Sequence, residues 1–246
     1  MTLPRVFTFW TGPAPSPIIQ LCLETIARNA PGAECWSLEQ WQAVYDGRLG
    51  PWKAIARQRP NVQSDILRAW LLTTYGGIWI DADCILFRDL RPLWQHIELG
   101  VDLVTYHVPA TKVCTALIAA SPDSRIMAKQ CRLIARELRQ QRKVSMFSLG
   151  PRLFRQAIQS CPGAAVEWLP FRMIHPAPWW TQGRHRKALK SVEIYNFHPD
   201  AYGFMLTHKA IKNLPANRRE DALGSPLPIG QAFRKAFGVL ENELCT

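Results

Sequence analysis

The order of apolar and polar residues along the chain predicts strands that alternate with helices. Short runs of aromatic and β-branched residues, such as RVFTFW near the start, are typical of strands. Apolar residues three and four positions apart, such as Ile19, Leu23 and Ile26, are typical of helices. Alternation of this kind predicts a mainly parallel sheet covered on both faces. The first elements are expected at residues 5–10 (strand), 18–28 (helix), 34–38 (strand) and 39–45 (helix).

The most regular pattern is the stretch SDILRAWLLTTYGGIWIDADC. Ser64 is expected to cap the N-terminus of a helix that Gly76 ends. The apolar run IWI (78–80) then predicts a strand buried on both faces. Asp81 and Asp83 follow this strand directly, so two carboxylates are expected at its C-terminal end.

The second half of the chain is less regular. The stretch LPFRMIHPAPWW, which begins at residue 169, holds too many prolines for a helix interior. No internal repeat or clear linker is present, and we expect a single domain over residues 1–246 with an irregular C-terminal third. Further elements are expected at residues 102–106 and 113–120 (strands), 124–144 (helix), 191–197 and 201–206 (strands) and 231–244 (helix).

Composition is that of a globular protein. The chain has 246 residues, of which 48% are hydrophobic and 20% charged, enough for one large α/β domain. No apolar run approaches the ~18 residues of a membrane span, and the first residues lack the basic-then-apolar order of a secretory signal. The seven cysteines form no CxxC pair, which favours reduced thiols over a disulfide framework or zinc site. We therefore expect a cytoplasmic protein.

Positive charge is in excess and gathers on the helix expected at residues 124–144. The net charge of +11 attracts polyanions in general. Basic residues on this helix recur at alternating steps of four and three, which places them on one ridge. A solvated helix face is one interpretation of the ridge, and a contact surface for acidic lipid head groups or an acidic glycan is another. The ridge consists of Arg125, Lys129, Arg132, Arg136, Arg139 and Lys143.

The aspartate pair is the strongest candidate for chemistry. In an extended segment Asp81 and Asp83 would project to the same side, at the strand end where open α/β sheets bind ligands. Two adjacent carboxylates repel each other unless a cation lies between them or one is protonated. Hard oxygen ligands suit Mg²⁺ or Mn²⁺, which share their coordination with substrate phosphates. The sequence therefore predicts a divalent metal that carries a diphosphate.

A second charged pair precedes the strand. Asp65 and Arg68 lie three residues apart on one helix face, which by itself indicates a weak intrahelical ion pair. With Ser64 as the cap, Asp65 would lie in the first helical turn, where the helix dipole favours a carboxylate and where a ligand could reach it.

The 24 residues from Ser64 to Phe87 resemble the signature of the DXD-containing sugar-binding glycosyltransferases. That family includes yeast initiating mannosyltransferases, α1,4-galactosyltransferases and bacterial capsular polysaccharide enzymes. Its pattern is Ser-Asp, two residues, Arg, then Leu, Gly-Gly-Ile, an aromatic residue, one residue and Asp-x-Asp, and every element is present here. The resemblance implies a GT-A fold, which is a nucleotide-sugar-binding α/β/α sandwich with a mainly parallel central sheet. It places the nucleotide-sugar-binding core in residues 1–160 and acceptor-side elaboration in residues 161–246.

The resemblance also implies roles for individual residues. Asp81 and Asp83 would bind Mn²⁺ or Mg²⁺, and Asp65 and Arg68 would contact the sugar or phosphate of the donor. The first strand ends like that of the family, which implies a nucleotide base beside Trp10. The other residues expected around the donor are Thr11, Gly12, Gly77 and Ala82.

A late histidine often adds a metal or phosphate contact in this family. Two histidines compete for this role in the sequence, and neither is followed by the expected tryptophan. His208 is favoured over His198 because it follows an apolar run.

The implied activity is transfer of a hexose from a nucleotide diphosphate sugar, with UDP as the favoured nucleotide, to a glycan or lipid-linked glycan acceptor. Retention of the anomeric configuration is expected, in surface polysaccharide or lipopolysaccharide synthesis at the inner membrane face. Three alternatives remain from the residues. A haloacid dehalogenase-type phosphatase also places Asp-x-Asp after a strand, but it commonly needs a later Gly-Asp or Asp-Asp pair, which the sequence lacks after Asp89. A non-catalytic sugar-nucleotide binder and a basic nucleic-acid-binding module are the others, and no nucleic-acid motif is present.

Overall fold

The computed structural model describes residues 3–107, 113–140, 148–174, 198–206 and 218–238. Contacts divide the chain into two compact units, and the chain passes between them several times. The first unit comprises Met1–Gly12, Glu34–Asp81 and Arg91–Leu169. The second unit comprises Pro13–Ala33, Ala82–Leu90 and Pro170–Thr246. The expected single domain with a change near residue 160 stays a prediction.

The first unit is built on a sheet of six described strands in the order β2-β1-β3-β6-β5-β7. Strand β1 is parallel to β2 and β3, and β5 is parallel to β7, whereas β6 runs antiparallel to both of its neighbours. The sheet is therefore mixed but mainly parallel, as expected for the predicted α/β class. The strands are β1 (Val6–Phe9), β2 (Glu34–Trp36), β3 (Gly77–Ile80), β5 (Leu103–Tyr106), β6 (Leu117–Ala120) and β7 (Val166–Leu169).

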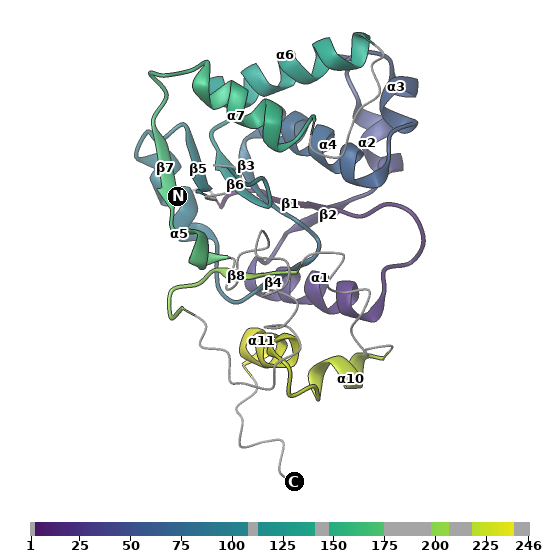
Figure 1. The fold of residues 1–246 in the computed structure, drawn as a ribbon, viewed down its shortest axis with the longest axis vertical. Helices are drawn as coiled ribbons and strands as arrows, with labels where there is room; N and C mark the ends of the chain where they lie inside the picture. The colour runs from purple at the N-terminus through teal and green to yellow at the C-terminus, as the bar shows by residue number, and fades with distance from the viewer. Residues whose placement is uncertain (1–2, 108–112, 141–147, 175–197, 207–217, 239–246) are drawn as a thin grey trace. The chain divides into compact units, whose positions relative to one another are not determined.

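Helices cover one face of this sheet and form a helical layer (Figure 1). Phe7 and Trp79 from the sheet and Trp41 and Trp70 from the helices share one apolar core. All residues of β1, β3, β5 and β6 are buried, as in strands covered on both faces. Helix α5 (Arg91–Glu98) contacts β5 and β6. The layer consists of α2 (Leu38–Val44), α3 (Trp52–Ala56), α4 (Pro60–Tyr75), α6 (Arg125–Arg139) and α7 (Pro151–Gln159).

Helix α4 starts five residues earlier than predicted, at Pro60 instead of Asp65. Pro60 occupies the first turn, where its missing N–H costs nothing, so Ser64 is inside the helix and does not cap it. Asp65 consequently lies in the second turn, and the predicted dipole contact of the first turn is wrong. Gly76 ends the helix as expected, with a φ of 63°, and Gly77 follows with a φ of 111°.

The second unit has its own apolar core. Strand β4 (Cys84–Leu86) pairs antiparallel with β8 (Gly203–Met205), which confirms a strand in the predicted segment 201–206. Leu21, Ile85, Phe204 and Phe233 pack together in this core. Its helices are α1 (Pro17–Asn29), α10 (Arg219–Leu223) and α11 (Pro228–Phe237), and a short 3-10 helix spans Phe171–Met173.

Other predicted elements differ in their limits. The strand expected at 113–120 is a strand only over its last four residues, in β6. The closing helix begins three residues before its expected start, because Pro228 initiates α11. The expected strand at 191–197 and the end of the helix at 124–144 lie outside the described residues. No helix in the described ranges has the length and apolar character needed to cross a membrane.

Gly77 is required by two constraints at once. Its φ of 111° disfavours any other residue, and a Cβ there would lie 2.5 Å from the carbonyl oxygen of Arg5 on the neighbouring strand. Gly77→Ala should lower the free energy of unfolding by roughly 3 kcal/mol, the sum of backbone strain and displacement of β1. Chemical denaturation measures this loss. The control is Gly100→Ala, because Gly100 has a φ of 91° but no atom within 4 Å of the added Cβ. Equal losses in both variants would contradict the packing argument.

Candidate active site

Asp81 stands at the C-terminal end of β3, in the edge of the sheet where the parallel strands end. Its backbone N–H donates to the carbonyl of Ala116 at 2.9 Å, which fixes the position of its Cα. Phe7 of β1 is level with Trp79 of β3, so two residues further on Phe9 is level with Asp81. Trp10 therefore follows β1 beside the residue that carries the first carboxylate, and its expected contact with the nucleotide base stays a prediction.

A buried arginine links this strand end to helix α4. Arg68 donates from one terminal nitrogen to Asp65 Oδ1 at 2.7 Å and from the other to Asp81 Oδ1 at 2.8 Å. Asp65 and Arg68 are 7% and 3% exposed, respectively. The pair predicted between Asp65 and Arg68 is thus present, but it is buried and shared with Asp81. We call these three residues the ion cluster.

Trp79 orients the same carboxylate. Its indole N–H donates to Asp81 Oδ1 at 2.6 Å, and the guanidinium of Arg68 lies over the indole ring, 4.9 Å from its centroid. Both hydrogen bonds to Asp81 use Oδ1, and Oδ2 accepts none from the side chains that the structure describes. Because the side chain of Asp81 is 23% exposed, this second oxygen is the part of the ion cluster able to bind an external cation.

Gly150 closes the other end of the ion cluster. A Cβ at Gly150 would overlap the carboxylate of Asp65, so only glycine fits at this position. The backbone N–H of Gly150 also hydrogen-bonds Asp65. Gly150 precedes Pro151, the first residue of α7, and no local sequence pattern indicates that this glycine supports Asp65.

Electrostatics in the ion cluster follow from burial. Burial raises the pKa of Asp65 to about 6, although Arg68 opposes this shift. Burial alone would lower the pKa of Arg68, but Asp81 and Asp65 outweigh it and the pKa is raised. With both carboxylates ionised the ion cluster carries one net negative charge, which favours a cation at Asp81.

Asp83 lies two residues further along the chain, at the start of the second unit. Residues 82–83 form a turn, so the extended segment expected to carry both aspartates is not present. The carbonyl of Asp83 accepts a hydrogen bond from the Leu206 N–H at 2.9 Å, just after β8. Burial, and then the charge of Asp83, raises the pKa of the Cys22 thiol on α1. Two peptide links hold the Cα atoms of Asp81 and Asp83 within about 7 Å of each other.

The donor set suits a hard divalent cation. The described residues contain no group of three or more His, Cys, Asp or Glu side chains able to hold a metal. Mg²⁺-like ions, however, need only one or two carboxylates when substrate phosphates and water complete their coordination. Asp81 and Asp83 each supply a carboxylate of this kind, so the chemistry of the residues present suits Mn²⁺ or Mg²⁺, and metal binding stays a prediction.

The remaining expected donor contacts divide into three groups. Trp10, Thr11 and Gly12 follow β1, and the Trp10 N–H donates to the Trp36 carbonyl at 3.0 Å. Ala82, which lies between the two aspartates in the sequence, is buried. Gly77 lies at the opposite end of β3 from Asp81, where it packs on Arg5.

His208 lies outside the described residues. The other candidate, His198, accepts a hydrogen bond at its Nδ1 from the backbone N–H of Asp200, at 3.2 Å. A role for either histidine in metal binding stays a prediction.

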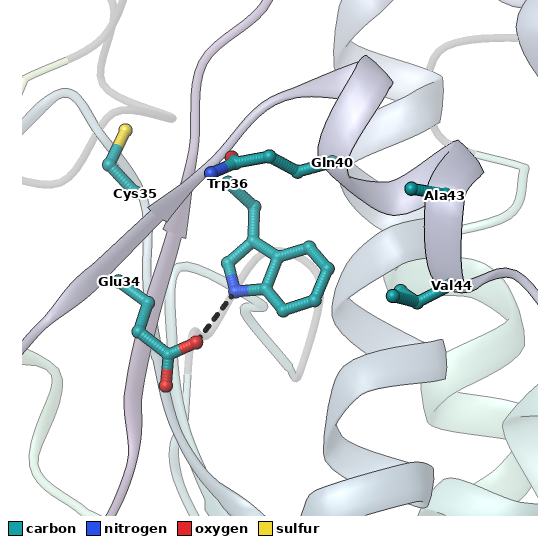
Figure 2. Close-up of a pocket in the computed structure, with 6 residues that line it drawn as sticks. All are labelled: Glu34, Cys35, Trp36, Gln40, Ala43 and Val44. Atoms are coloured by element: carbon teal, nitrogen blue, oxygen red, sulfur yellow. Dashed lines mark hydrogen bonds between the residues drawn. The ribbon is translucent and has the colours of Figure 1, made fainter.

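A groove of about 480 Å³ lies beside β2, the edge strand of the sheet (Figure 2). The Trp36 ring lies between Glu34 on one side and Gln40 and Val44 on the other (Figure 2). Trp36 donates its indole N–H to Glu34 at 3.1 Å, and Arg5 binds both oxygens of Glu34 at 2.8 Å. None of the predicted site residues lines this groove, so it is separate from the ion cluster.

Comparison with protein families gives one match. Residues 53–147 match the model of a family described as capsular polysaccharide synthesis protein. The match covers less than half of the chain, but it includes the ion cluster and Asp83. Comparison with curated proteins gave no match.

Solved glycosyltransferase structures share the fold. The glycosyltransferase GlyE of Streptococcus pneumoniae TIGR4 superposes with a TM-score of 0.52 at 12% identity, over 96% of this chain and 64% of GlyE. The apo form of mouse xyloside xylosyltransferase 1 superposes with a TM-score of 0.50 at 8% identity, over 84% of this chain and 98% of that one. This chain thus spans slightly less than two thirds of GlyE. The shared fold is consistent with the expected GT-A class.

The raised pKa of Asp65 predicts an unusual pH dependence of stability. Because the folded protein binds the proton more tightly than the unfolded chain, Asp65 stabilises the fold fully below pH 4 and loses this contribution as pH rises through about 6. Between pH 4.5 and 7 the wild type should lose about 2 kcal/mol more unfolding free energy than Asp65→Asn. Urea denaturation of both proteins at the two pH values measures this difference, and parallel pH profiles would contradict it.

Proposed function

We propose that this protein is a metal-dependent glycosyltransferase that moves a hexose from a nucleotide diphosphate sugar to an acceptor hydroxyl. The observation that carries the proposal is the oriented carboxylate of Asp81 at the end of β3, with its Oδ1 held by Arg68 and Trp79. Asp83 follows two residues later, so two carboxylates are available to one cation. The family match over residues 53–147 and the shared fold support the same activity.

In this proposal Asp81 and Asp83 hold Mn²⁺ or Mg²⁺ against the donor diphosphate. The cation, when bound, neutralises the charge that develops on the departing diphosphate. The protein's own contribution is orientation, because a carboxylate fixed before the donor binds needs no rearrangement during the reaction. We propose a UDP-sugar as the donor, with Trp10, Thr11 and Gly12 beside the base.

We propose that Arg68 and Asp65 have a positioning role. Arg68 fixes the Asp81 carboxylate, and Asp65 supplies the second negative charge that keeps the guanidinium paired on α4. Among the described residues, Nε of Arg68 is a buried donor without a hydrogen-bond acceptor, and in this proposal a water or an oxygen of the donor sugar accepts from it. The contacts of Asp65 with sugar hydroxyls, which the resemblance implies, form the further part of this proposal.

The acceptor in this proposal is a glycan or lipid-linked glycan in surface polysaccharide or lipopolysaccharide synthesis. The description of the matched family supports this class of acceptor. We propose reaction at the cytoplasmic side of the membrane with retention of the anomeric configuration. A haloacid dehalogenase-type phosphatase is disfavoured, because it commonly needs a later Gly-Asp or Asp-Asp pair, which the sequence does not contain after Asp89.

Donor identity can be tested by ligand-dependent stability. A ligand that binds only the folded state raises the melting temperature, and the shift grows with affinity. UDP-galactose, UDP-glucose, UDP-N-acetylglucosamine and GDP-mannose should be compared with and without Mn²⁺. We expect one nucleotide sugar to raise the melting temperature only when Mn²⁺ is present. Equal shifts without the metal would contradict the proposed mode of binding.

Turnover separates an enzyme from a sugar-nucleotide binder. Asp81→Asn and Asp83→Asn should each lower the rate of donor turnover, by transfer or by the slower hydrolysis, at least about a hundredfold. The reason is that the negative charge that develops on the leaving diphosphate is no longer countered. Release of the nucleoside diphosphate is the measurement. Asp123→Asn is the matched control, since Asp123 is exposed in the first unit. Turnover near the wild-type rate in either active-site variant would contradict the assignment of Asp81 and Asp83 to the active site. Hydrolysis of a generic aryl phosphate would favour the phosphatase.

A further inference from the structure

The outer face of α6 carries only positive side chains. Every fully exposed residue of this helix is an arginine, and Lys129 is half-buried on the same ridge. These side chains occupy the ridge that the sequence predicted, whose last member, Lys143, lies outside the described residues. The exposed arginines are Arg125, Arg132, Arg136 and Arg139.

The fold holds this ridge rigidly outward. The opposite face of α6 is buried, with Met127, Ile134 and Leu138 in the core of the first unit, and the helix packs against α4 and α7. Helix α6 therefore cannot rotate to hide its cations. From Arg125 to Arg139 the ridge extends about 21 Å, with a cation roughly every 5 Å along the helix axis. Figure 1 shows α6 on the outside of the helical layer.

Neighbouring acids do not neutralise the ridge. Glu137 is the one carboxylate on α6, and it lies 3.5 Å from Arg152 of α7 with only 14% of its side chain exposed. Within the described part of the chain, no carboxylate forms an ion pair with Lys129, Arg132, Arg136 or Arg139. Most of the charge on the ridge is consequently available to an external partner.

Further exposed cations lie on other parts of the helical layer. Arg155 is exposed on α7, and three exposed cations lie between the start of α3 and the start of α4. The three cations are Lys53, Arg57 and Arg59. Helix α2 differs, because its exposed charged residue is Glu39.

The side chains between the cations decide which polyanion fits. Single-stranded nucleic acid binds through aromatic side chains on which bases stack, but no large apolar side chain is exposed on α6 or α7 in the described residues. A glycan needs amide or carboxylate partners for its hydroxyls, and the glutamine within α6, Gln130, is buried. The ridge offers charge and forked guanidinium donors alone, which match phosphate.

We propose that the exposed face of α6 docks this protein reversibly on an anionic phospholipid membrane. Anionic lipids diffuse laterally in the membrane and can gather under a fixed row of arginines. The phosphates of a rigid polyanion would instead have to match the spacing of the arginines. Since no large apolar side chain is exposed on the described part of the ridge, Arg125–Arg139, attachment is electrostatic and weakens as salt rises. The inference does not rest on the proposed transferase activity, but it would bring such an enzyme to a lipid-linked acceptor.

Vesicle binding tests this proposal with matched variants. The full chain is mixed with vesicles of phosphatidylcholine alone or of phosphatidylcholine with phosphatidylglycerol, and the bound fraction is measured by sedimentation. The test variant carries Arg132→Gln, Arg136→Gln and Arg139→Gln. The control carries Arg28→Gln, Arg172→Gln and Lys235→Gln, three exposed positions in the second unit, so both variants have the same net charge.

The wild type should bind the phosphatidylglycerol vesicles and not the neutral ones. Each basic residue at a membrane surface is worth roughly a fivefold gain in binding, so the test variant should bind about a hundredfold more weakly. The control should bind like the wild type. Equal weakening of both variants would show that net charge, not the ridge, binds the vesicles and would overturn the proposal. It would also be overturned if the test variant kept vesicle binding but lost binding to hyaluronate or single-stranded DNA.

Discussion

The structure depends on one buried guanidinium shared by two carboxylates. Arg68 ties Asp65 on its own helix to Asp81 at the end of β3, so a single side chain sets the position of α4 against the sheet and the orientation of the candidate metal ligand. A buried ion pair contributes little net stability, but removal of one partner leaves an uncompensated buried charge, which costs about 3–5 kcal/mol. Any arrangement that separates Arg68 from one of its carboxylates would leave a buried charge unpaired, so the ion cluster keeps its geometry. This rigidity holds the Asp81 carboxylate in one orientation.

Charge links the site to the rest of the molecule. The ion cluster retains one net negative charge, and Asp83 adds a second nearby along the chain, so the site attracts a divalent cation in a protein whose overall charge is +11. In the proposed function, a diphosphate that approaches the protein would meet a positive field at long range and the acidic site with its bound cation at short range. A positive overall charge and a negative site are compatible, because the overall charge raises the rate at which a diphosphate meets the protein, whereas the site determines how it binds.

The sequence predicted elements with strong local patterns and missed those set by tertiary contacts. Strands β1 and β3 and the strand end at Asp81 follow from apolar runs, and the ion pair of Asp65 and Arg68 from helical spacing. The predicted start of α4 was wrong, because Pro60 initiates the helix and Ser64 therefore lies inside it. No local pattern shows that Arg68 reaches Asp81 thirteen residues later, or that Gly150 lies against Asp65. Short elements such as α3 and β7 lack the periodicity that reveals longer ones.

The most direct test of the central claim is a crystal structure of the chain with Mn²⁺ and UDP, with the metal located by its anomalous scattering. The account predicts one manganese peak within coordination distance of Asp81 Oδ2, of the Asp83 carboxylate and of the diphosphate, with the hydrogen bonds of Arg68 to Asp65 and Asp81 retained. UDP bound without metal at these aspartates, or manganese bound elsewhere in the protein, would contradict it.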